Sequence, residues 1–357
     1  MSELTAYYPP ETRVMPMILL RRERLLPADG AILVAPGQRV ESSDVVARTE
    51  VGGQFRTFEI ARLLRVPPAR ATKYLKKHVG DVIKTGDVLA SRPMRQVRSP
   101  ISGTIVDVDP RDGRVAIEIA SKEVELRAYL KGIVGNILGN RGVVVETPGA
   151  LIQAAWGIGG ESYGVLHVVT ESADEPLKAS LIDVKAHGSV VAGGGWITAS
   201  ALEQAQSLQL RGMIAGSIEG DLIETAMQLP FPIILTEGVG RSAMAAPIFE
   251  LIRSQEGREV SISAETRMRW GVVRPEILIP LPAETRPPLP PAVGSPLTVG
   301  ARVRVVRGPY VGSVGTVSAI PSRAQRIETG TRVHGAEVRF SPSSAAFVPF
   351  ANLELLR

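Results

Sequence analysis

The stretch Gly300–Val317, GARVRVVRGPYVGSVGTV, carries the most specific fold signal in this chain. Val303 and Val305 alternate with Arg302 and Arg304, which predicts a strand with one buried face and one basic face. The glycines that follow permit a tight turn and close backbone packing, and a second valine-containing segment completes the pattern. The sequence therefore predicts a strand, a tight turn and a second strand at the start of a small β-domain.

This pattern resembles the KOW motif of NusG-type transcription elongation factors and certain ribosomal proteins. The matching positions are Val303, Val305, Gly308, Gly312, Gly315 and Val317. The resemblance implies an SH3-like KOW barrel over residues 297–357, and it implies contacts to RNA, the ribosome or RNA polymerase. No NusG-like amino-terminal domain precedes the motif, so polymerase binding through such a domain is not implied.

The same segment is strongly basic. Residues 297–357 hold eight arginines, no lysine and three acids, so their charge of 8 − 3 = +5 equals the formal charge of the whole chain. A basic module indicates a polyanionic partner; the alternatives are a solvated basic surface or a small barrel used for protein docking. The candidate phosphate contacts are Arg302, Arg304, Arg307, Arg323, Arg326, Arg332 and Arg339, and Tyr310 is the candidate base-stacking residue.

Upstream of this module, residues 280–296 contain seven prolines and predict an extended, semi-rigid linker. Before it, residues 146–279 alternate strand-like and helix-like patterns, with strands expected at 213–215 and 233–235 and a helix at 175–184. Thr198 is expected to cap a further helix whose residues Ala201, Leu202, Ala205 and Leu208 point inward. These alternating units predict a central parallel α/β domain.

Ligands of such sheets bind in the loops beyond the carboxyl ends of the strands. The loops here are rich in glycine and hydroxyl groups, which suits anion binding, although glycines also serve simple tight turns. The candidate ligand-binding residues are Thr170, Glu171, Gly194, Ser217, Thr236, Glu237, Gly238 and Arg241. Their spacing matches neither a Walker loop nor a dinucleotide fingerprint, and no nucleophile–base pair is identifiable.

Residues 21–145 are rich in short β-type runs, with a helical insertion at 58–77, and residues 1–20 are expected to be a tail or an edge strand. GDVIKTGDVLA at 80–90, followed by SPISGTI at 99–105, resembles the barrel-sandwich hybrid of biotinyl and lipoyl domains. The resemblance implies the fold alone. Covalent carriage needs a hairpin lysine, and here Met94 is followed by Arg95.

The composition excludes several kinds of chemistry. With no cysteine, the chain has neither disulfides nor thiolate metal sites, and its four histidines lack metal-ligand spacing. We therefore expect no metal, no cofactor and no catalytic residues. No apolar run approaches the roughly 18 residues of a membrane span, so we expect a cytoplasmic protein.

Together these features predict a multidomain protein of α/β plus β class. It would have a β-rich hybrid-like amino-terminal domain, a central parallel α/β domain and a carboxy-terminal SH3-like KOW barrel. The expected function is that of a non-catalytic adaptor or regulatory factor that binds nucleic acid or a nucleoprotein machine. The alternative is a regulator that senses an anionic metabolite or nucleotide at the α/β loops, and an enzyme at these loops ranks last. The oligomeric state is left open.

Overall fold

The computed structural model describes residues 7–111, 113–119, 122–266, 273–282 and 296–356. Within them, 29 β-strands are joined by five short α-helices. The helices are α1 (Ile60–Leu64), α2 (Pro68–Ala71), α3 (Ala199–Ser207), α4 (Ile223–Met227) and α5 (Ala246–Arg253). Among the described residues, no helix has the length and apolarity that crossing a bilayer requires. Most of the predicted proline-rich linker, residues 283–295, lies outside the described residues.

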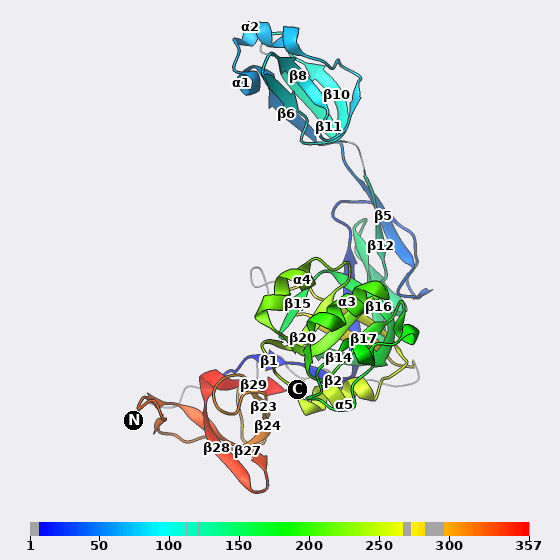
Figure 1. Ribbon diagram of the computed structural model, residues 1–357. Coiled ribbons are helices and arrows are strands. Elements are labelled where there is room, and N and C mark those ends of the chain that lie inside the picture. The colour runs from blue at the N-terminus through cyan, green and yellow to red at the C-terminus, as the bar shows by residue number, and fades with distance from the viewer. Residues whose placement is uncertain (1–6, 112, 120–121, 267–272, 283–295, 357) are drawn as a thin grey trace.

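One twelve-stranded sheet forms the body of the molecule (Figure 1). Its order is β15-β20-β19-β17-β16-β21-β22-β14-β13-β4, with β18 beside β19 and β2 beside β14. The strands are β2 (Val14–Leu25), β4 (Arg39–Val40), β13 (Gly132–Ile137), β14 (Gly142–Gln153), β15 (Trp156–Ile158), β16 (Glu161–Val168), β17 (Val190–Ala192), β18 (Trp196–Ile197), β19 (Gly212–Ile218), β20 (Ile233–Val239), β21 (Glu259–Ser263) and β22 (Glu276–Pro280). The strands of this sheet therefore come from residues between 14 and 280 of the chain.

The predicted α/β fold class, with its central parallel α/β domain, is wrong. The described chain is mostly β, and its parallel strands are one part of a mixed sheet. β16, β17, β19 and β20 do pair in parallel, but β16 also pairs antiparallel with β21. β21 continues through β22 to β14. Because β14 runs through residues 145 and 146, the sheet continues where a separate domain was expected to begin.

The helix predicted at 175–184 is also wrong. The segment contains two 3₁₀ turns, η2 (Ala179–Leu181) and η3 (Val184–Ala186). Leu177 forms a parallel bridge with Ile197, and its backbone N–H donates to the Trp196 carbonyl at 2.9 Å. Backbone pairing with a neighbouring segment thus replaces the helical hydrogen bonds that the side-chain pattern suggested.

The parallel strands carry a helix on each face. The Thr198 cap is confirmed, since its hydroxyl accepts the Ala201 N–H at 3.3 Å. Ala201, Leu202 and Ala205 of α3 are buried on one face of the sheet. The apolar side of α5 packs on the other face, against alternate residues of the same strands. Because successive side chains of a strand point to opposite faces of the sheet, the same strands contact α3 on one face and α5 on the other.

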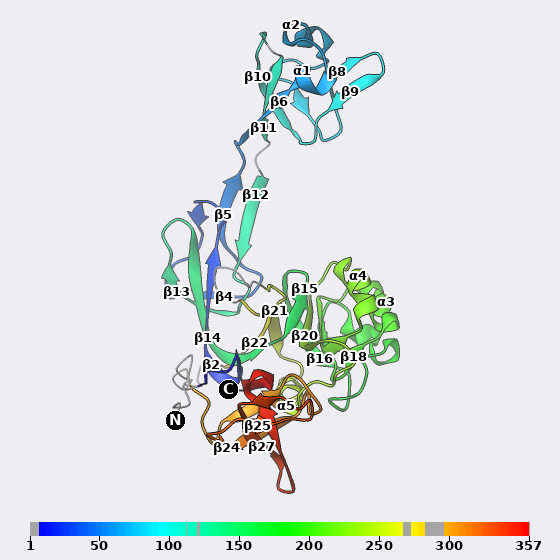
Figure 2. The ribbon, with the colours of Figure 1, turned by 90° about the vertical axis from the view of Figure 1, so that its left-hand side faces the viewer.

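A second module stands away from the body at the end of a two-stranded arm (Figures 1 and 2). The arm is formed by β5 (Val45–Val51) and β12 (Lys122–Arg127), with β3 (Ala31–Ile32) beside β5. The module contains β6 (Phe55–Glu59), β7 (Val82–Ile83), β8 (Val88–Arg92), β9 (Arg95–Arg98), β10 (Gly103–Val108), β11 (Arg114–Ile119), α1, α2 and η1 (Thr72–Tyr74). Ile60 and Leu64 of α1 are buried in its core. Residues 55–119 therefore have a core of their own, which we call the distal module.

A six-stranded sheet lies at the opposite end of the molecule, in the order β1-β29-β23-β24-β27-β28 (Figure 2). Its elements are β1 (Glu11–Thr12), β23 (Arg302–Val305), β24 (Val314–Ala319), β27 (Gly335–Ser341), β28 (Ser344–Pro349), η5 (Phe350–Asn352) and β29 (Leu353–Leu356), with a hairpin of β25 (Gln325–Arg326) and β26 (Arg332–Val333). Val303, Val305, Val317 and Val338 are buried in its core. We call this unit the C-terminal sheet; β1 pairs in parallel with β29 at its edge.

Candidate functional site

Six of the seven predicted phosphate contacts are exposed on the C-terminal sheet. They are Arg302, Arg307, Arg323, Arg326, Arg332 and Arg339. Among the described residues, no acidic side chain forms an ion pair with any of these six. Two exposed acids, Glu328 and Glu337, lie in the same unit, so its exposed charge is 6 − 2 = +4. The unit therefore presents uncompensated positive charge to solvent.

Sheet register gathers two of these arginines into one row. Arg302 on β23 is directly opposite Thr316 on β24, and Thr316 is directly opposite Arg339 on β27. Residues opposite each other on neighbouring strands share a face, and neighbouring strands lie about 4.8 Å apart. The two arginine side chains thus project from the same face of the sheet, and one strand lies between the strands that carry them.

A second pair is brought together by the hairpin. Arg326 and Arg332 are directly opposite each other on β25 and β26. Like charges at directly opposed positions destabilise a strand pair, and both side chains are exposed. A bound anion between or beside them would remove that repulsion.

Beside the hairpin, Tyr310 borders a cavity of about 520 Å³. Arg307 and Arg326 line the same cavity. The Tyr310 ring stacks on Phe340, with centroids 5.2 Å apart and planes inclined by 25°, while 40% of the residue is exposed. One aromatic residue and two arginines from the predicted set are therefore gathered around one hollow.

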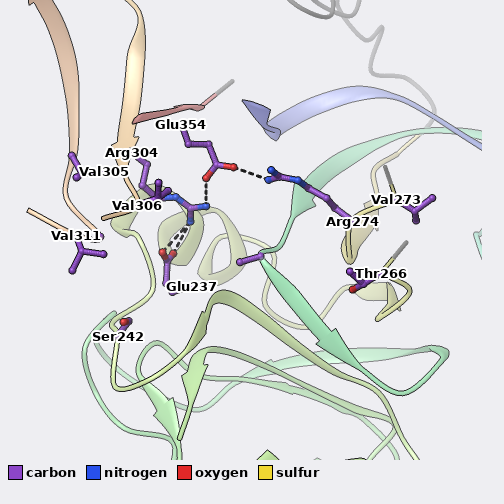
Figure 3. Close-up of a pocket in the computed structure, with 12 residues that line it drawn as sticks. Glu237, Ser242, Thr266, Val273, Arg274, Arg304, Val305, Val306, Val311 and Glu354 are labelled. Atoms are coloured by element: carbon purple, nitrogen blue, oxygen red, sulfur yellow. Dashed lines mark hydrogen bonds and ion pairs between the residues drawn. The ribbon is translucent and has the colours of Figure 1, made fainter. Parts of the chain in front are cut away.

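Arg304 has a different place from the one predicted. It is buried, with 3% of its side chain exposed, because its side of β23 packs against the body. Its Nη1 donates to both carboxylate oxygens of Glu237, at 2.9 and 3.0 Å. Its Nη2 donates to Glu354 at 2.6 Å, and Arg274 donates to the other oxygen of Glu354 at 2.7 Å. Arg304 therefore joins the C-terminal sheet to the body (Figure 3) and is not free to bind a phosphate.

For each of the two carboxylates, burial and the neighbouring positive charge shift the pKa in opposite directions. Burial raises the pKa of Glu237 above its ordinary value, and Arg304 offsets part of that rise. Burial also raises the pKa of Glu354, but Arg304, the Thr12 hydroxyl and Arg274 outweigh it and hold this pKa below its ordinary value. A cavity of about 440 Å³ adjoins these groups. The sequence did not point to Thr12, Arg274 or Glu354, because their spacing along the chain carries no signal.

The predicted ligand-binding hydroxyls are used inside the fold. Thr170 accepts the Gly194 N–H at 2.8 Å, and Ser217 donates to the Ser242 carbonyl at 3.0 Å. Thr236 is fully buried and lies 3.5 Å from the Ala215 carbonyl. Ser217 and Thr236 lie in β19 and β20, not in loops as expected, and the three contacts fasten neighbouring strands and loops to one another rather than presenting a set of free donors.

The other predicted ligand residues have separate positions. Arg241 is paired with Glu219 at 2.8 Å, Glu171 is exposed, and Gly238 lies within β20 with a positive φ of 88°. Glu237 alone of the eight predicted residues lines the cavity beside Arg304. Among the described residues, no cluster of three or more acidic or histidine side chains is arranged to hold a metal ion.

Comparison with protein-family models finds no match to this chain, and comparison with curated proteins finds none either.

Proposed function

We propose that this protein is a non-catalytic factor that binds single-stranded RNA, or RNA within a nucleoprotein, through its C-terminal sheet. The observation that carries the proposal is the set of six exposed arginines without acidic partners among the described residues, two of which, Arg307 and Arg326, line the cavity beside Tyr310. Arginine binds phosphate through paired donors. An exposed aromatic ring adds stacking that tolerates any base.

The combination of features favours nucleic acid over other polyanions. Arg302 and Arg339 share a face, which suits a linear array of phosphates. The partly exposed Tyr310 ring beside Arg307 offers a base both a stacking face and a nearby cation. The resemblance to KOW modules supports the same partner class. A cytoplasmic location, and the ribosome or RNA polymerase as the assembly that supplies the RNA, belong to this proposal.

A salt titration of the full chain tests the proposal. Fluorescence anisotropy with a labelled single-stranded RNA gives the affinity at several salt concentrations, and each phosphate contact contributes about 0.7 to the log–log slope. Replacing Arg302, Arg332 and Arg339 with alanine should lower that slope by about 2, since 3 × 0.7 is about 2. The matched control replaces Lys178, Lys185 and Arg258, which are exposed on the body, and should leave the slope unchanged.

Two results would contradict the proposal. One is the absence of RNA binding by the intact chain at low salt. The other is a slope that falls equally in the C-terminal variant and in the body control, because that would indicate general charge rather than this surface.

A further inference from the structure

The distal module carries more positive charge than the C-terminal sheet. Residues 55–119 contain 13 lysines and arginines and 7 acids, a charge of 13 − 7 = +6. The chain as a whole carries +5, and residues 297–357 carry +5. The rest of the chain therefore has a charge of 5 − 6 − 5 = −6. Charge is thus segregated into a basic module at each end and an acidic body between them (Figure 2).

The positive charge of the distal module is concentrated in its helical tip. Residues 59–77 contain six basic side chains and one acid, Glu59. Arg62 lies 3.9 Å from Glu59, and Lys77 lies 3.9 Å from Asp87. The other four basic residues are exposed and have no ion pair with any described acid. They are Arg65, Arg70, Lys73 and Lys76.

The arm makes this tip accessible. β5 and β12 pair antiparallel from residue 45 to residue 51, and at about 3.4 Å per residue such a ribbon separates two bodies by about 20 Å. The apolar residues of α1 are buried in the distal module itself, so the helices do not need the body for packing. The basic tip faces away from the acidic body in both views (Figures 1 and 2).

We infer that the distal module is a second nucleic-acid-binding site, which contacts phosphates through Arg65, Arg70, Lys73 and Lys76. An extended polyanion is the partner that fits two basic modules on either side of an acidic body. The contact is to the backbone and reads no sequence, because α1 and α2 are only five and four residues long. Helices of this length are too short to present a recognition helix to a groove. Simultaneous contact at both ends rests on the proposed function of the C-terminal sheet, whereas binding by the distal module does not.

The experiment uses the full chain in four forms and a single-stranded RNA of about 60 nucleotides, long enough to reach both ends at several ångströms per nucleotide. The forms are the unaltered chain, a distal variant with all four residues replaced by alanine, the C-terminal variant described above, and the combination. A charge-preserving control carries Arg65→Lys, Arg70→Lys, Lys73→Arg and Lys76→Arg. Circular dichroism verifies that each variant is folded.

The distal variant should lower the salt slope by about 2.8, since 4 × 0.7 is 2.8. It should do so both in the unaltered background and in the C-terminal variant, while the charge-preserving control keeps the slope. Equal slopes with and without the distal substitutions would overturn the inference. The inference would also be overturned if the distal variant lost binding to anionic lipid vesicles or to an acidic polypeptide while its RNA binding stayed unchanged. If the distal substitutions act and the C-terminal ones do not, the proposed function fails while the distal site stands.

Discussion

Replacing Arg304 with methionine tests the buried network that joins the C-terminal sheet to the body. Glu237 and Glu354 have side chains that are only 7% and 6% exposed. Without the guanidinium, Glu354 keeps Arg274 and the Thr12 hydroxyl, but among the described residues Glu237 keeps only the Ala245 N–H as a donor, at 3.1 Å. Removing one partner of a buried pair costs about 3–5 kcal/mol, because it leaves an uncompensated charge. We expect a loss of that size in the free energy of unfolding at neutral pH.

Urea denaturation followed by circular dichroism measures this loss. The control is Arg302→Met on the same strand, whose side chain is exposed and should matter by less than about 0.5 kcal/mol. Adding Glu237→Gln to Arg304→Met removes the buried, uncompensated negative charge and should restore about half of the lost stability. An Arg304→Met variant within about 1 kcal/mol of the unaltered protein would refute the reasoning. So would a double variant no more stable than the single one.

Three further predictions concern the same region. Glu354→Gln should destabilise the protein at neutral pH, and the gap from the unaltered chain should shrink as the pH falls below 4.5, because the folded pKa of Glu354 lies below that value; denaturation series at several pH values measure this. Tyr310→Ala should weaken RNA binding by about 1–3 kcal/mol in anisotropy titrations, while Tyr310→Phe keeps most of the affinity. Gly315→Ala should lower the free energy of unfolding by about 1–3 kcal/mol, because its Cβ would lie 2.7 Å from the Arg339 carbonyl oxygen; a thermal melt that matches the unaltered protein would contradict this.

Local patterns correctly predicted several local features, although the helix expected at 175–184 did not form. The strands at 213–215 and 233–235 were correctly placed, as were the Thr198 cap and the inward face of α3. Each of these depends on residues close together in the sequence, where periodicity and capping chemistry act directly. The fold class was not predictable in this way, because the mixed sheet depends on pairings such as β14 with β22, more than a hundred residues apart.

Arg304 shows the same limit at the level of one side chain. Its alternation with Val303 correctly indicated a strand and the burial of the valine. Alternation cannot say what covers the second face of a strand, and here the end of β20, which carries Glu237, covers it. A buried arginine between two carboxylates leaves no trace in the local sequence, since its partners lie 67 and 50 residues away.

The pairing of β1 with β29 has a consequence for synthesis of the protein. The Tyr7 ring stacks on Phe350, with centroids 4.6 Å apart, and its hydroxyl donates to the carbonyl of Phe350, 343 residues later. During translation, β1 and the Tyr7 ring therefore lack these partners until the ribosome has added Phe350 and the residues of β29. Until then β23 lacks one neighbour and presents an open strand edge, which invites aggregation. A nascent chain that stops short of Leu353 cannot add β29 between β1 and β23. The C-terminal sheet, with its exposed arginines, should therefore be complete only on chains whose synthesis has passed that point.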